Sequence, residues 1–151
     1  MTAAKRSSSR HRSREAALQM LYALDLARGN PARGPAKVEE VFQGVCENFE
    51  LPEGARAFAK ELVTGVTAQG PALDAEIARH AQRWRISRMA AVDRNVLRLG
   101  AFELLYTDAP AAVVIDEGVE LARRFGGERS PGFVNGILDA IASGRRNGEA
   151  P

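Results

Sequence analysis

The residue types that could carry catalysis or bind a metal are few and widely spaced in this sequence. A single cysteine, Cys46, excludes an internal disulfide and a cysteine-based zinc site, and the two histidines, His11 and His80, lie far apart. Asp116 and Glu117 are adjacent, so on a helix they point in different directions and do not form a paired acid and base. No Ser–His–Asp pattern and no phosphate-binding P-loop is present. We therefore expect no metal, no cofactor and no enzyme activity.

Positive charge is concentrated at the N-terminus, where residues 1–14 hold five Lys and Arg residues and no acid, against 16 basic and 19 acidic residues in the remainder. A helix is expected from about Arg10, which would place Arg10 and Arg14 at a positive helix end, where each cation costs about 0.3–1 kcal/mol. A phosphate backbone would turn this cost into binding, because arginine side chains and free helix N–H groups both attract anions. The arm is predicted to bind an anionic partner; the alternative is a solubilising tail.

A second anion-binding candidate lies in "RRFGGERSPGFVNGILDAI" at 123–141. A pair of glycines ends one expected helix, and Ser130, followed by proline, is the expected N-cap of the next. The turn between them would expose a helix N-terminus beside Arg129. Phe133, in the first turn of the second helix, is either a core anchor or a platform on which a base stacks. Tyr22 could offer another such ring or fill the core as a half-buried residue.

That last helix contains residues with low helix propensity. Gly132, Asn135 and Gly136 stand among apolar residues that repeat at the helical period, where a helix built only to fill a core would carry Ala or Leu. Close packing within the chain and contact with RNA both explain this choice, and packing is the preferred explanation.

The elements that must position these residues are predicted to be helices. The apolar period of 3.6 residues and the Gly/Pro breaks give about seven of them and no convincing strand. Their expected ranges are about 10–28, 37–50, 55–67, 71–81, 89–106, 112–125 and 130–143. The sequence has no 18-residue apolar run and no secretory signal, so a cytoplasmic protein without a membrane partner is expected.

The helices are expected to form one domain over 10–143. It would follow a flexible basic arm at 1–9, precede a polar tail at 144–151, and divide into lobes of about 10–83 and 88–143. The apolar stripes predict its core as Val38, Val41, Val45, Phe58, Leu62 and Val66 in the first lobe and Val96, Leu99, Ile115, Val119, Ile137 and Leu138 in the second.

Three stretches of the sequence resemble the NusB family of transcription antitermination factors. They are "SRHRSREAALQMLYALDL" at 9–26, "VDRNVLRLGAFELLY" at 92–106 and "VVIDEGVELARRFGGERSPGFVNGILD" at 113–139. The resemblance implies an all-helical fold of two three-helix bundles with an extra helix. It also implies binding of boxA single-stranded RNA, pairing with NusE, a ribosomal protein of the small subunit, and assembly with RNA polymerase in antitermination complexes on ribosomal RNA operons.

The resemblance also assigns residues. Carried over by position, the RNA-binding residues would be Arg10, His11, Arg14, Tyr22, Phe125, Arg129 and Phe133, and Asp93 would contact NusE. The sequence departs from some relatives: the position of Arg129 is acidic in them, Gly132 stands where a lysine occurs, and Ala111 and Ala112 replace larger polar residues near the NusE face.

Two alternatives stay open. A similar helical domain precedes the catalytic domain in some ribosomal RNA cytosine methyltransferases, although we expect no α/β cofactor domain after residue 151. Some family members form dimers, so a homodimer with a masked RNA face is the other alternative.

Overall fold

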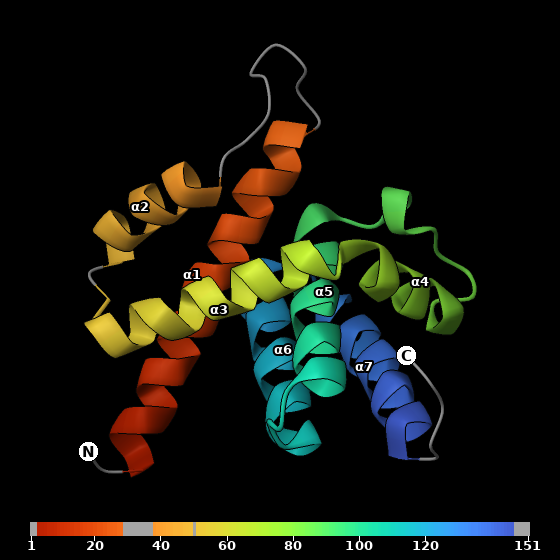
Figure 1. Cartoon of the computed structure of the whole chain (residues 1–151). Helices are drawn as coiled ribbons and strands as arrows, with labels where there is room; N and C mark the ends of the chain where they lie inside the picture. The colour runs from red at the N-terminus through yellow and green to blue at the C-terminus, as the bar shows by residue number, and fades with distance from the viewer. Residues whose placement is uncertain (1–2, 29–37, 50, 147–151) are drawn as a thin grey trace. The chain divides into compact units, whose positions relative to one another are not determined.

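The computed structural model describes residues 3–28, 38–49 and 51–146, and within these ranges the chain is helical and has no strand (Figure 1). The all-α prediction is confirmed. The elements are α1 (Ala3–Arg28), α2 (Val38–Phe49), α3 (Glu53–Ala68), α4 (Gly70–His80), the 3-10 turn η2 (Ile86–Arg88), α5 (Ala91–Tyr106), α6 (Ala111–Phe125) and α7 (Ser130–Arg146). The predicted loop at 29–37 and the last residues of the predicted tail, 147–151, lie outside the described residues.

Helix α1 begins at Ala3, so the prediction of a flexible arm up to residue 9 is wrong for residues 3–9. The segment "AAKRSSSR" contains no glycine or proline that would stop a helix, and its Ala, Lys and Arg residues are good helix formers. Arg10 therefore lies about two turns inside the helix. Because the dipole effect falls off within the first turn, the expected electrostatic cost at Arg10 and Arg14 does not arise. At the other end of the chain, α7 continues to Arg146 and takes up the start of the predicted polar tail.

The middle of α1 is covered on every side. Six consecutive residues, 13–18, are buried, and they include the apolar side chains of Ala16, Ala17 and Leu18. The hydroxyl of Ser13 lies 2.9 Å from the carbonyl oxygens of both Ser9 and Ala55. A serine hydroxyl thus joins α1 to the first turn of α3 inside the first unit.

The chain divides into two compact units between Thr64 and Gly65, inside α3, and not between residues 83 and 88 as predicted. The first unit holds α1, α2 and most of α3, and the second holds the end of α3 and α4–α7. Helix α4 was expected in the first lobe but packs on α5 and α7. Its Leu73 and Ile77 side chains are fully buried, which explains why α4 belongs with the second unit.

The core of the second unit is built by α5, α6 and α7, which pack against one another. Leu138 of α7 is fully buried and lies over two glycines. A Cβ added at Gly100 of α5 or at Gly118 of α6 would lie 2.8 Å from a Leu138 methyl carbon. The two glycines therefore let three helices meet around one leucine.

The predicted core is confirmed in part. The buried members are Leu62, Val66, Val96, Leu99, Ile137 and Leu138. The half-buried members are Val45, Phe58, Ile115 and Val119. The side chains of Val38 and Val41 lie outside the described part. On α6 the stripe is shifted by one residue, to Val114, Gly118, Leu121 and Ala122. The sequence pattern missed this because a glycine, which contributes no apolar side chain, lies at its centre.

The exposed glycines of α7 do not serve packing within the described chain. Gly132 and Gly136 are exposed, and a Cβ at either would meet no atom within 4 Å. We expect Gly136→Ala to raise the free energy of unfolding by about 1 kcal/mol, the propensity difference between the two residues. The matched change Gly118→Ala should lower it, because Leu138 must move. Urea unfolding of both variants measures the two signs, and a loss of stability in Gly136→Ala would show that this surface is packed after all.

Candidate nucleic-acid interface

The basic residues of α1 differ in exposure. Arg10 and Arg12 are exposed, whereas Arg14, which was expected at the same helix end as Arg10, is only 4% exposed. The guanidinium carbon of Arg10 lies 4.1 Å from the centre of the half-buried Phe58 ring, and that of Arg14 lies 5.6 Å from it. Such cation–π contacts hold a guanidinium in place while leaving its N–H donors available at the edge. Among the described side chains of this region, the exposed arginines are therefore Arg10 and Arg12.

Two further predicted residues lie on α1. His11 Nε2 lies 2.9 Å from Glu15 Oε1, one helical turn away. The imidazole is half-buried. Tyr22 is half-buried, which agrees with either of its expected roles. The first unit thus offers a short cationic surface at Arg10 and Arg12, with the His11 imidazole between them in sequence.

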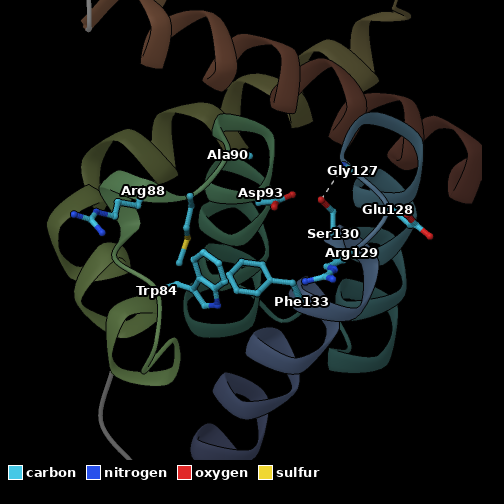
Figure 2. A pocket seen from close by; sticks show the side chains of 10 residues that line it. Trp84, Arg88, Ala90, Asp93, Gly127, Glu128, Arg129, Ser130 and Phe133 are labelled. Carbon is cyan, nitrogen blue, oxygen red and sulfur yellow. Dashed lines mark hydrogen bonds between the residues drawn. The ribbon is translucent and has the colours of Figure 1, made fainter.

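The second unit contains a cleft with a volume of about 720 Å³ between the segment that follows α4 and the turn that precedes α7 (Figure 2). We call it the Trp84–Phe133 cleft. It is lined by Trp84, Arg88, Met89, Ala90, Asp93, Gly127, Glu128, Arg129, Ser130 and Phe133.

Two aromatic rings form the floor of this cleft. The centroids of Trp84 and Phe133 are 6.1 Å apart and their planes meet at 80°, which is an edge-to-face pair. Trp84, the only tryptophan of the chain, is 56% exposed. Arg129 lies beside Phe133, whereas the side chains of Arg88 and Glu128 point away from the rings (Figure 2). A ring system that is held in place and open to solvent is suited to stacking with a flat ligand.

Asp93 lies in the first turn of α5 at the wall of the same cleft. Its Oδ1 atom is buried and accepts no hydrogen bond from any group in the described part of the chain. A buried acceptor without a donor is destabilising, so such an atom needs an explanation. Asp93 lines the cleft as a residue, but this oxygen itself is closed to solvent.

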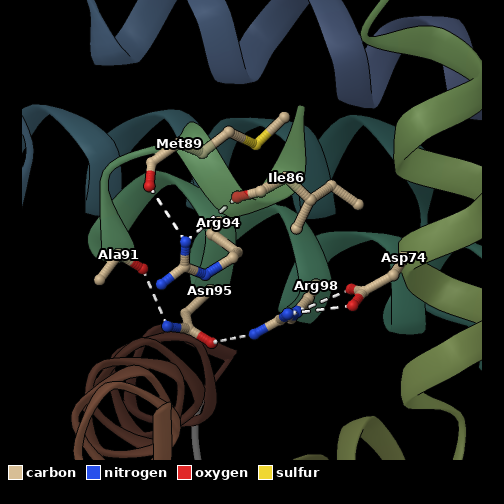
Figure 3. Close-up of polar contacts among 7 residues, drawn as sticks. All are labelled: Asp74, Ile86, Met89, Ala91, Arg94, Asn95 and Arg98. Carbon is tan, nitrogen blue, oxygen red and sulfur yellow. Dashed lines mark hydrogen bonds and ion pairs between the residues drawn. The ribbon is translucent and has the colours of Figure 1, made fainter. Parts of the chain in front are cut away.

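The wall that carries Trp84 and Met89 is fixed to α5 by one arginine (Figure 3). Arg94 Nη1 donates to the carbonyl oxygens of Ile86 and Met89, at 3.1 Å each. These bonds satisfy two carbonyls of the 3-10 turn and its end, and they set the position of the segment that forms one side of the cleft.

The start of α5 is in turn fixed to α4 (Figure 3). Asp74 binds Arg98 through both carboxylate oxygens, at 2.7 and 3.0 Å, a bidentate ion pair. Arg98 also donates to Asn95 Oδ1 at 3.2 Å, and Asn95 Nδ2 donates to Ala91 O at 2.8 Å. This chain of polar contacts orients the first turns of α5, on which Asp93 lies.

The turn on the other side of the cleft has a tight geometry. Ser130 is buried, and its hydroxyl accepts the N–H of Gly127 at 2.9 Å. Ser130 was predicted as the N-cap of α7, but the helix begins at Ser130 itself and its hydroxyl stabilises the preceding turn. A Cβ at Gly126 would lie 2.6 Å from that hydroxyl, so this turn requires glycine there. Together these contacts place Arg129 and Phe133 at the cleft.

The structure brings together some of the predicted site residues. Arg129, Phe133 and Asp93 line one cleft, although Asp93 was assigned to a different partner. Phe125 does not line it. That ring is half-buried at the end of α6, with the Arg124 guanidinium carbon 5.2 Å from its centre.

Comparison with known proteins identifies the family. Residues 11–143 match the family model described as the NusB family. The chain belongs to the NusB family. The transcription antitermination protein NusB of Desulfotalea psychrophila is 44% identical over 135 residues, which cover 89% of this chain and 95% of that protein.

Solved NusB structures have the same fold. The structure of T. maritima NusB superposes with a TM-score of 0.79 at 34% identity, covering 94% of this chain and 93% of that one. A crystal structure of the antitermination factors NusB and NusE in complex with dsRNA gives a TM-score of 0.77 at 32% identity, covering 90% of this chain and 97% of that one. The NusB fold predicted from the resemblance is therefore confirmed.

Sequence reasoning missed two features of the cleft. Trp84 lies in the connector "RWRISRM" and was given no role, although an aromatic residue among three arginines was a usable signal. The function of Arg94 as the link between α5 and the connector depends on backbone carbonyls, which no side-chain pattern reveals.

Within the described helices none is long and apolar enough to cross a membrane.

Proposed function

We propose that this NusB-family chain is a transcription antitermination factor. It binds boxA-type single-stranded RNA together with NusE and joins RNA polymerase on ribosomal RNA operons. The observation that carries the proposal is the Trp84–Phe133 cleft, where the exposed Trp84 ring and the half-buried Phe133 ring lie beside Arg129 in a chain of this family. The NusB relative that was crystallised with NusE and RNA supports the choice of partners.

The proposal describes a binding factor without catalysis, metal or cofactor. It acts in the cytoplasm, because RNA polymerase and nascent RNA are there. The alternative of a homodimer with a masked RNA face is tested by light scattering at several protein concentrations. The methyltransferase-related alternative is tested by methyl transfer to ribosomal RNA with a methyl donor present.

The central experiment measures RNA affinity with and without purified NusE, on boxA-like RNA and on a scrambled sequence of the same composition. We expect tight binding only for boxA-like RNA with NusE present. Equal affinity for both RNAs under both conditions would contradict the proposed function.

The cationic surface of α1 is expected to contribute a salt-dependent part of this affinity. Replacing both Arg10 and Arg12 with Gln should weaken RNA binding and reduce the slope of log affinity against log salt by about 0.7 for each phosphate that the protein no longer neutralises. A matched control, Arg79→Gln with Arg145→Gln, removes the same charge from exposed residues elsewhere. An unchanged slope in the α1 variant would mean that this surface is only solubilising.

The partner contact through Asp93 stays a prediction. It rests on the resemblance alone, since no contact in a single chain tests it. Asp93 also has the simpler role of a negative charge in the first turn of α5, which suits the helix dipole.

A further inference from the structure

We propose that the turn between α5 and α6 is a docking surface for a lysine- or arginine-rich protein segment of the transcription complex, other than NusE. We call it the Tyr106–Asp116 surface, and it consists of Tyr106, Asp108, Val113 and Asp116, all of which are exposed. The inference rests on the proposed function, because it states by which end the chain contacts a further protein of the complex that it joins.

Two exposed apolar side chains are the anchors of this surface. Tyr106, the last residue of α5, is 39% exposed, and Val113, in the first turn of α6, is 44% exposed. The other large apolar side chains that are exposed in the described part of the chain are Trp84, in the cleft, and Leu26, in the first unit. Because a short turn at 107–110 joins two helices that pack on each other, both anchors lie at the same end of the α5–α6 hairpin (Figure 1).

The tyrosine is held in a fixed position. Its ring stacks on Phe102, with the centroids 5.8 Å apart and the planes at 20°. Phe102 fills the space beside Gly65, where an added Cβ would collide with the ring. The hydroxyl of Thr107 donates to the carbonyl oxygen of Glu103 at 2.7 Å and accepts the N–H of Ala109 at 3.2 Å, which fixes the turn. An ordered aromatic ring loses little conformational entropy on binding, and tyrosine is enriched among the residues that dominate protein–protein affinity.

The helix ends and the turn that form this surface carry only acidic charge. Residues 99–122 contain five acidic residues and are the longest stretch of the sequence without Lys, Arg or His. Asp108 and Asp116 are exposed, and neither makes an ion pair or a side-chain hydrogen bond within the described residues. A partner that covers the two anchors must also neutralise these carboxylates. Lysine and arginine side chains do so, whereas the phosphates of an RNA strand are repelled.

The surface lies far from the residues assigned to RNA and NusE. Asp93 is in the first turn of α5 and Tyr106 is its last residue, so they are about 20 Å apart along the helix at 1.5 Å per residue. Near the start of α5 the connector carries three exposed arginines, Arg83, Arg85 and Arg88. The second unit therefore presents basic residues near one end of α5 and acidic residues at the other.

Two other occupants compete with the proposed one. The resemblance places Ala111 and Ala112 near the NusE face, and both lie in the first turn of α6, at the same end as the proposed surface. A second copy of the chain could bring its exposed connector arginines to the two carboxylates. A further protein is preferred over NusE because Asp93, the residue assigned to NusE, lies at the opposite end of α5.

The experiment uses the full chain, purified NusE and a stalled RNA polymerase elongation complex whose transcript carries a boxA-like sequence. Three affinities are measured: for NusE alone, for boxA-like RNA with NusE, and for the elongation complex with NusE. One double variant, Tyr106→Ser with Val113→Ser, removes the apolar anchors. A second, Asp108→Lys with Asp116→Lys, reverses the charge.

A matched control reverses two exposed acidic residues elsewhere, Glu61→Lys with Asp139→Lys. Both surface variants should bind the elongation complex about tenfold more weakly, as expected when interface anchors are lost, and the control should not. Their affinities for NusE and for RNA should stay unchanged, which also shows that the variants fold. The difference between the unmodified chain and the charge variant should shrink as salt is raised, because salt screens exposed charges.

A photo-crosslinking residue placed at Val113 identifies the occupant. The expected cross-link in the elongation complex is to a lysine- or arginine-rich segment of a protein other than NusE. A cross-link to NusE, with loss of NusE affinity in the surface variants, would assign the surface to NusE and overturn the inference. A cross-link to a second copy, with a mass in light scattering that rises with concentration, would overturn it in favour of self-association.

The affinities separate this inference from the proposed function. If boxA-like RNA binds with NusE but both surface variants join the elongation complex as the unmodified chain does, the inference fails and RNA binding with NusE stands. If the unmodified chain binds no boxA-like RNA with NusE, the proposed function fails.

Discussion

Replacing Phe133 with alanine is expected to weaken RNA binding by about 1–3 kcal/mol, the value of one base stacked on an aromatic ring. The ring lies at the floor of the cleft and supports Trp84 at 6.1 Å, so its loss removes a stacking surface and frees the second ring. The slope of log affinity against log salt should not change, because no phosphate contact is removed. The measurement is RNA affinity with NusE at several salt concentrations.

Phe133→Leu is the matched control for this prediction. It keeps an apolar side chain in the first turn of α7 but removes the flat ring. Both variants should lose the same part of the RNA affinity, while only Phe133→Ala should also lose stability. Normal RNA binding by Phe133→Leu would show that Phe133 serves packing alone.

Replacing Leu138 with alanine is expected to lower the free energy of unfolding by about 2–5 kcal/mol, the range for a leucine removed from a closed core. Leu138 is 0% exposed, and its methyl groups lie over Gly100 and Gly118. These glycines have no side chains that could move into the cavity. Urea unfolding measures the loss, and Leu26→Ala, at a residue that is 51% exposed, should change stability by less than about 0.5 kcal/mol.

A second variant makes the same prediction sharper. Gly118→Ala alone should destabilise the chain, since the new methyl group meets Leu138. In the Leu138→Ala background the same methyl group enters the cavity and should be neutral or stabilising. The two changes are then strongly non-additive, as expected for residues in contact. Additive effects would contradict the packing of Leu138 over Gly118.

The sequence predicted the helices of the described residues because apolar residues repeat at the helical period and Gly or Pro separates the segments. It failed where the decisive interaction joins distant residues. Helix α4 belongs to the second unit through Leu73, Ile77 and the ion pair between Asp74 and Arg98, which are 24 residues apart. The burial of Arg14 is likewise a property of the packed helix, since the sequence around it is strongly polar.

Prediction of the candidate site succeeded for residues with an evident local signal. A glycine turn that precedes a helix points to Arg129 and Phe133, and both line the cleft. That Trp84 lines the same cleft as Arg129 and Phe133 could not be predicted, because the position of Trp84 depends on how the connector after α4 folds back on α5. The expected role of Arg10 depended on a helix end that lies elsewhere, although the residue is exposed.

The attachment of the cleft wall has a consequence for the local stability of the second unit. The 3-10 turn contributes no buried residue, and Arg94 holds two of its backbone carbonyls through one nitrogen. Opening this segment exposes Met89 and separates Trp84 from Phe133, which is less apolar surface than the helices beneath it bury, so it needs less free energy than unfolding those helices. Amide protons of residues 82–90 should exchange with solvent through such local opening, while those of α5 exchange through global unfolding. A change that opens only this segment can then abolish RNA binding while the melting temperature of the protein stays normal.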